Sequence, residues 1–133
     1  MEFSAYTREA GVKVHISDLS RLETKEGRFY LDGREVKRVR ILGIVVSRHR
    51  VQAGRMVRAT LDDGTGNFDI VDYVNTDKYI QGKMYDVIVN LSFAKGRLVG
   101  VVDTVAEVPD ERQRDMKLLR EKEIEIQRKA LSE

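Results

Sequence analysis

Apolar residues recur at every second position over most of the chain up to about residue 105, which is the pattern of half-buried β-strands. Within residues 36–74 this pattern predicts three consecutive antiparallel strands, and two more follow a polar connection at Asn75–Gly82. The five predicted strands are Val36–Ser47, Arg55–Leu61, Asn67–Val74, Lys83–Leu91 and Arg97–Val105. Shorter β-prone stretches at Val12–Ile16 and Phe29–Leu31 precede them.

Glycines mark the turns between these segments. Asp32-Gly33 lies between two β-prone runs and predicts a two-residue hairpin turn. The segment 62–66 (Asp-Asp-Gly-Thr-Gly) predicts a tight turn between the second and third strands, and Ala94-Lys95-Gly96 predicts a short turn between the fourth and fifth. Gly43 lies inside a strand that is apolar on both faces, so it predicts the bend that a small barrel needs at a corner.

Five strands, joined mainly by hairpins, fit an all-β, five-stranded oligonucleotide-binding (OB) barrel, and an SH3-like barrel is the main alternative. The sequence therefore predicts three parts. Residues 1–35 form an N-terminal extension whose short strands pack on the barrel. Residues 36–108 form the barrel, and residues 109–133 form a C-terminal amphipathic α-helix.

The C-terminal segment Asp110–Ser132 contains neither Gly nor Pro, and its first acidic residues suit a helix N-terminus. Six apolar side chains fall within an arc of roughly 160° on this helix. They are Met116, Leu119, Ile124, Ile126, Ala130 and Leu131. Such a stripe covers either the chain's own barrel or the helices of a partner, and we expect the partner, because the predicted barrel closes without the helix.

Composition limits the class of protein. The chain has 133 residues, no Cys and 41% hydrophobic residues, enough for one modest core and without disulfides or thiolate metal sites. It has no apolar run long enough to span a membrane and no secretory leader, so we expect a cytoplasmic or nucleoid protein in a prokaryote, or a nuclear one in a eukaryote. Charged residues reach 35%, which is typical of hyperthermophiles.

The positive charge is local. The net charge is +2, but residues 107–133 hold seven basic and eight acidic residues, so residues 1–106 carry a net charge of +3. Between Arg48 and Arg58 there are four Arg and no acid. A local excess of this kind favours a polyanionic ligand.

Catalysis has little support in the sequence. The two histidines, His15 and His49, lie far apart and outside any catalytic signature, and neither a phosphate-binding P-loop nor an HExxH zinc motif occurs. The acidic turn at 62–67 lacks the ligand alternation and closing Glu of a calcium loop. We therefore expect no enzyme, no cofactor and no metal site.

Binding to single-stranded nucleic acid requires cations along the phosphates and aromatic faces for the bases. The candidate platforms are Tyr73, on the third strand, and Phe93, at the fourth–fifth connection. The candidate cations are Arg48, Arg50, Arg55, Arg58, Lys95 and Arg97. The alternatives are that Tyr73 only shields core, that Phe93 anchors its loop, and that the cations form a solvated face.

Two segments carry a resemblance to a known family. LDDGTGNFDIVDYVNTD (residues 61–77) resembles the second and third strands of the middle subunit of replication protein A, and FYLDGREVKRVRILGIVVS (residues 29–47) resembles the strand entering the barrel in that subunit and its telomere-capping paralogues. The resemblance covers about Val36–Val105 and the position of the C-terminal helix. In the family, an aromatic residue at the position of Tyr73, often Trp, and the Phe at the position of Phe93 contact single-stranded DNA.

The resemblance implies a non-catalytic, single-stranded-DNA-binding subunit that acts in DNA replication and repair, with its C-terminal helix assembling other OB subunits into a heterotrimer. Fuller family members add a winged-helix domain and a phosphorylated N-terminus, so we expect either a minimal archaeal-type subunit or a piece of a longer chain. Two alternatives remain open: an OB scaffold subunit of a telomere-type or repair complex, and an RNA-binding OB domain.

Overall fold

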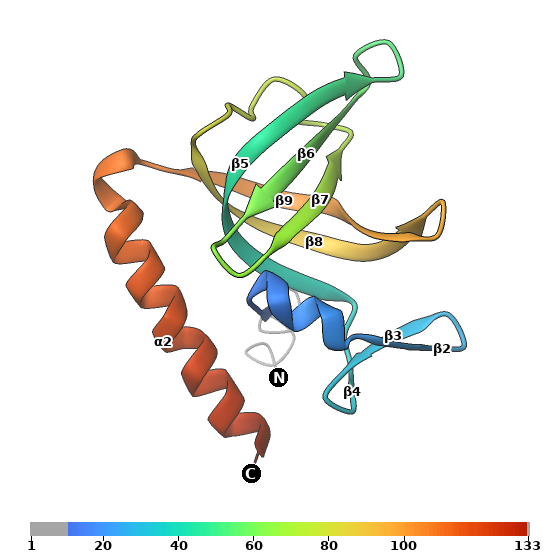
Figure 1. The fold of residues 1–133 in the computed structure, drawn as a ribbon, viewed down its shortest axis with the longest axis vertical. Helices are drawn as coiled ribbons and strands as arrows, with labels where there is room; N and C mark the ends of the chain where they lie inside the picture. Colours follow the sequence, from blue (N-terminus) through green and yellow to red (C-terminus); the bar gives the residue numbers. More distant parts are fainter. Residues whose placement is uncertain (1–10, 133) are drawn as a thin grey trace, which may run out of the picture.

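A computed structural model describes residues 11–132 of the protein, with side chains from Gly11 to Ala130. Strands dominate the described part, and a long helix follows them (Figure 1). The barrel strands are β5 (Arg38–Val51), β6 (Met56–Asp62), β7 (Asn67–Asp72), β8 (Met84–Ala94) and β9 (Arg97–Val108). The remaining elements are β1 (Val12–Lys13), η1 (Ile16–Arg21), β2 (Glu23–Lys25), β3 (Arg28–Leu31), β4 (Arg34–Glu35), η2 (Asp110–Arg112) and α2 (Gln113–Ser132).

The five long strands close into a barrel. The order is β5-β6-β7-β9-β8, and β8 pairs back onto β5; all contacts are antiparallel except β7–β9. The long strand β5 pairs with two strands: its first half pairs with β8 and its second half with β6. Ile44 pairs with a residue of each. The predicted five-stranded OB barrel and its C-terminal helix are therefore confirmed.

Glycines allow close backbone contact at two points of the barrel. At Gly43, where β5 changes partner, an added Cβ would lie 3.3 Å from the Asp62 carbonyl oxygen, which agrees with the predicted corner. At Gly100 on β9 the neighbouring atoms lie even closer than at Gly43. A Cβ there would lie 2.6 Å from Val89 Cγ2 and 2.9 Å from Phe68 Cε2, inside the core.

The N-terminal segment adds two small units to the barrel. β1 pairs in parallel with β5, and β2, β3 and β4 form a separate three-stranded sheet whose turn at Asp32-Gly33 has positive φ at both residues, as the sequence predicts for a hairpin. The expected strand Val12–Ile16 is too long, because Ile16 already begins the 3₁₀ helix η1. Residues 1–10 of the predicted extension lie outside the described residues.

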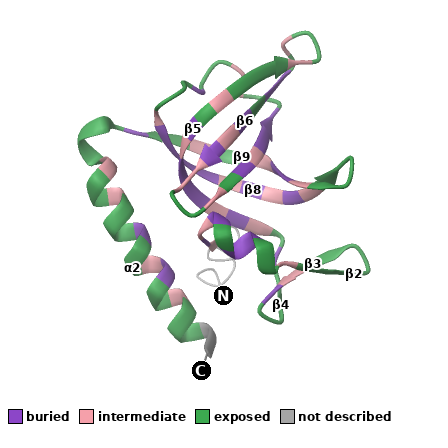
Figure 2. Cartoon of the chain, viewed as in Figure 1, coloured by how far each residue is buried: buried purple, intermediate pink, exposed green. Residues whose placement is uncertain are grey.

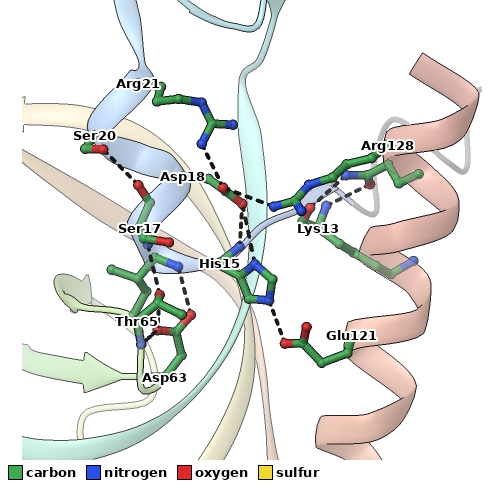
Figure 3. A network of polar contacts seen from close by, with 12 residues as sticks. Lys13, His15, Ser17, Asp18, Ser20, Arg21, Asp63, Thr65, Glu121 and Arg128 are labelled. Carbon is green, nitrogen blue, oxygen red and sulfur yellow. Dashed lines mark hydrogen bonds and ion pairs between the residues drawn. The ribbon is translucent and has the colours of Figure 1, made fainter. Parts of the chain in front are cut away.

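The turn between β6 and β7 supports η1. Asp63 Oδ2 accepts a hydrogen bond from the backbone N–H of Ile16 at 2.8 Å, and Thr65 Oγ1 accepts one from Ser17 at 3.0 Å (Figure 3). These bonds satisfy backbone donors at the start of η1 that have no partner within the helix. The acidic turn, expected only as a hairpin turn, therefore also joins the extension to the barrel.

Polar contacts dock α2 on its own barrel and extension. Gln127 accepts a hydrogen bond from the Lys13 N–H at 3.0 Å and donates one to the Lys13 carbonyl at 2.7 Å. The buried guanidinium of Arg120 donates to Asp86 on β8 at 2.8 Å. Figure 3 shows two further contacts on the extension, His15–Glu121 and Arg128–Asp18.

The expected apolar stripe of α2 is divided between two faces. Met116 packs with Leu42, Met84 and Val108, and Ile124 is only 2% exposed, so these two side chains face the chain's own barrel and extension. Leu119 and Ile126 are more than half exposed, and Ala130 is also exposed (Figure 2). Leu118, outside the predicted stripe, is exposed as well, and the side chain of Leu131 lies outside the described residues. Over residues 11–132, no helix combines the length and apolarity needed to cross a bilayer.

Candidate nucleic-acid interface

Tyr73 lies directly after β7 and has an exposed ring. Along β7, Phe68 and Ile70 point into the core, and Asp69 and Val71 lie on the opposite face, where Val71 is also buried. Tyr73 continues the outward set and keeps 55% of its surface exposed. The sequence predicted this side for Tyr73, and a ring in this position can offer a face to a base.

Asp72 fixes the backbone next to Tyr73. Its Oδ1 accepts hydrogen bonds from the Val74 N–H at 2.8 Å and the Asn75 N–H at 2.9 Å, and its Oδ2 accepts one from the Tyr79 hydroxyl at 2.6 Å. Burial by itself would raise the pKa of Asp72, but these hydrogen bonds outweigh it and hold the pKa below its ordinary value. Burial and the bond to Asp72 raise the pKa of Tyr79. The carboxylate therefore stays charged at neutral pH and orders the segment that carries Tyr73.

Phe93 lies at the end of β8, where the β8–β9 hairpin projects from the barrel (Figure 1). Its ring is 51% exposed, and one side of it contacts Phe29 of β3, with ring centroids 5.3 Å apart and an interplanar angle of 33°. The sequence indicated a strand at Phe29 but gave no signal for this long-range contact. Phe29 is therefore the aromatic residue at this surface that sequence reasoning missed.

Tyr73 and Phe93 adjoin the same strand, β9. Phe93 pairs with Leu98, and β7 pairs with β9 at Ile70–Gly100, so about five residue steps, or ~16 Å, separate the two aromatic positions along the strand direction. OB domains engage about 4–16 nucleotides. One single strand is long enough to reach both rings, with Tyr73 on the outward face of its strand and Phe93 continuing the core-facing set of β8 at the end of the hairpin.

Arg58 belongs to the outward face of β6. It pairs with His49 on one side and Val71 on the other, and its side chain is exposed. It forms no ion pair with any residue from 11 to 130. Arg58 and Tyr73 therefore share the outer side of neighbouring strands, as predicted.

Arg48 and Arg50 lie on the opposite face of the β5–β6 hairpin. They pair with Ala59 and Val57, whose side chains point to the core, and directly opposed residues share a face. Arg50 also forms an ion pair with Asp77 in the β7–β8 connection. The structure thus separates these two cations from Arg58, with which the sequence grouped them.

The remaining predicted cations lie at hairpin tips. Arg55 is exposed at the end of the β5–β6 turn, and Lys95 and Arg97 are exposed at the β8–β9 turn beside Phe93. Lys95 and Gly96 both have positive φ, which is the two-residue turn that such a hairpin favours. Among the residues that the structure describes, no cluster of three or more potential metal ligands occurs.

Comparisons with known proteins place the fold. No protein-family model and no curated protein sequence matches the chain. A chain of the S. pombe Stn1–Ten1 complex has a similar structure, with a TM-score of 0.76, 14% identity and coverage of 89% of this chain and 90% of the other. A chain of the yeast Stn1 and Ten1 structure is also similar, with a TM-score of 0.72 and 14% identity. The match covers 92% of this chain and 74% of that one.

A third similar structure is a chain of a replication protein A heterotrimer bound to single-stranded DNA. Its TM-score is 0.68 at 19% identity, and the match covers 80% of this chain and 88% of that one. At these identities the likeness is one of fold. The fold of this chain is that of the OB domains found in replication protein A and Stn1–Ten1 assemblies.

Proposed function

We propose that this chain is a non-catalytic, single-stranded-DNA-binding subunit of a replication-protein-A-like complex. The observation that carries the proposal is the pair of half-exposed rings, Tyr73 and Phe93, on the two strands that flank β9. Arg58 beside the first ring, and Lys95 and Arg97 beside the second, supply cations for the phosphates. The similar chain in a replication protein A heterotrimer bound to single-stranded DNA supports the same assignment.

The proposal extends to the outward face of α2 as the surface for other OB subunits. Leu119 and Ile126 lie two turns apart on one side of the helix and are exposed, while the other side is docked on the chain's own barrel and extension. Helices of a partner would bury these side chains. Leu119→Glu and Ile126→Glu should abolish association with partner subunits without changing the melting temperature of the isolated chain, because both sites face solvent.

Fluorescence anisotropy with labelled oligo-dT, oligo-rU and duplex DNA tests the binding function. We expect preference for single strands and a log–log salt slope of about −0.7 for each phosphate contact. Tyr73→Ala and Phe93→Ala should each weaken binding by about 1–3 kcal/mol, the value of one base stack. Comparable affinity for oligo-rU would support the RNA-binding alternative.

Leu118→Ala is the matched control, since it removes an exposed apolar side chain of α2 that belongs to neither proposed surface. It should leave the affinity unchanged. If both aromatic variants fold and bind like the wild type, the chain acts as a scaffold through protein contacts. Equal affinity for duplex DNA, or a flat salt dependence, would also contradict the proposed function.

A further inference from the structure

The three-stranded sheet β2–β3–β4 contacts the β8–β9 hairpin near its turn, through Phe29 and Phe93. Figure 1 shows the β2–β3 hairpin and the β8–β9 hairpin projecting on the same side of the molecule, and the Phe29–Phe93 contact joins them. Although Phe29 packs on Phe93, half of the Phe93 surface remains exposed. Phe29 thus backs the ring and widens the apolar platform at this end of the proposed DNA site.

A hollow of about 340 Å³ adjoins this platform between β3, the segment after β4 and β8. Its lining includes Phe29 and Leu91, and Leu91 precedes Phe93 by two residues on the same face of β8. The hollow therefore shares Phe29 with the Phe29–Phe93 contact, although Phe93 itself is not part of its lining. Its volume is in the range of small-ligand sites.

The charge of the hollow favours an anion. Arg28 and Lys37 line it, with Glu35 as the one carboxylate among the lining residues. Glu35 is paired with Arg28 at 3.7 Å, whereas Lys37 is exposed and forms no ion pair with any residue from 11 to 130. A ligand with one negative charge beside an aromatic or apolar ring fits this lining, and a nucleotide of a single strand has that chemistry.

We infer that β2–β3–β4 is a second wall of the nucleic-acid site, in which Phe29 supports the base stack on Phe93 and the hollow holds the next nucleotide, with its phosphate on Lys37. The inference rests on the proposed function and adds a subsite to it. Phe29 acts as a positioning residue for Phe93, and Lys37 acts as a phosphate contact. The small sheet thereby lengthens the bound segment beyond the β8–β9 tip.

A single fluorophore tests the first part, because the chain contains no Trp. In Phe29→Trp, titration with oligo-dT should quench Trp fluorescence with the same midpoint as the anisotropy change, since bases stack close to the indole. Leu118→Trp, on the exposed surface of α2, is the control and should show no quenching at equal occupancy. An unquenched Phe29→Trp that still binds oligo-dT would overturn the role of Phe29.

Charge reversal at an exposed position tests the second part without risk to the fold. Lys37→Glu should weaken binding to oligo-dT of about 16 and of about 8 nucleotides and reduce the salt slope by about 0.7 at both lengths, because either strand is long enough to reach the nucleotide next to Phe93. Lys122→Glu on α2 is the matched control. Wild-type behaviour of Lys37→Glu at both lengths, with binding still dependent on Tyr73, would overturn the subsite alone. Failure of the wild-type chain to bind any single strand would overturn the proposed function and the subsite together.

Discussion

Asp72 is the buried group on which the position of Tyr73 depends. Its side chain accepts hydrogen bonds from Val74, Asn75 and Tyr79, and the residue is only 1% exposed. Asp72→Ala removes the acceptor from all of them. The backbone amides of Val74 and Asn75 can turn to water at the surface, but the Tyr79 hydroxyl is buried and loses its partner.

An unsatisfied buried hydroxyl costs about 1–3 kcal/mol, and the lost bonds to a charged acceptor add to it, so Asp72→Ala should lower the free energy of unfolding by about 2–4 kcal/mol. Asp72→Asn should cost less, because its amide oxygen still accepts from both backbone amides. Freeing the backbone of one residue beside Tyr73 adds about 1–2 kcal/mol to the ordering that DNA must supply. The Ala variant should therefore bind oligo-dT roughly 5- to 30-fold more weakly, measured where it is fully folded.

Urea unfolding at neutral and acid pH measures how much the charge of the Asp72 carboxylate contributes to stability. The pKa of Asp72 in the folded chain lies below the ordinary value of 3.8, so the carboxylate stabilises the fold above about pH 4, and this contribution is lost as the pH falls through the folded-state pKa. The stability difference between the wild type and Asp72→Asn should shrink on acidification. Other depressed carboxyl groups, such as Asp18 and Asp86, cancel in this difference. Wild-type urea midpoints and oligo-dT affinity in Asp72→Ala would refute this account of the loop.

Two further substitutions test the packing that supports the site. Gly100→Ala places a methyl group 2.6 Å from Val89 and 2.9 Å from Phe68. We expect this crowding to lower the free energy of unfolding, measured with urea, by about 1–3 kcal/mol. An unchanged urea midpoint would mean that β9 shifts to make room without loss of stability. Asp86→Asn removes the carboxylate that pairs with Arg40 and with the buried Arg120, and leaves Glu123 as the carboxylate partner of Arg120. We expect the free energy of unfolding, measured with urea, to fall by about 3–5 kcal/mol; a loss below about 1 kcal/mol would show that Arg120 can leave the barrel freely.

Local patterning predicted the barrel because each strand carries its own signal. Alternation and, for the first strand, an apolar run located the five long strands, and the Asp-Gly and Gly turns located the hairpins. The strand ends were less accurate: β5 continues to Val51 and β9 to Val108, beyond the expected Ser47 and Val105. Backbone pairing extends into polar stretches whose side chains show no alternation, so the pattern ends before the strand does.

A β-bulge decides on which face of β5 Arg48 and Arg50 lie. Simple alternation from Val45 would place Arg48 and Arg50 on the outer face with Arg58. The register of β5 against β6 shifts between Val45 and Ser47, and one extra residue reverses which side chains point outward. Sequence alone shows no bulge, because a bulge depends on the partner strand. The contact of Phe29 with Phe93 is hidden for a similar reason, since it joins two hairpins far apart in the chain.

The docking of α2 changes what its deletion would measure. Apolar periodicity could not separate the two faces, because the barrel-facing side is held by polar groups, Arg120 and Gln127, as well as by Met116 and Ile124. Removal of residues 110–133 would expose Asp86, take away its ion pair with Arg120 while the pair with Arg40 remains, and also remove the outward apolar side chains. Loss of stability and loss of association would then coincide, whether or not a partner helix exists. Substitution of the outward face alone separates the two roles, since a surface charge there leaves every contact between α2 and the barrel in place.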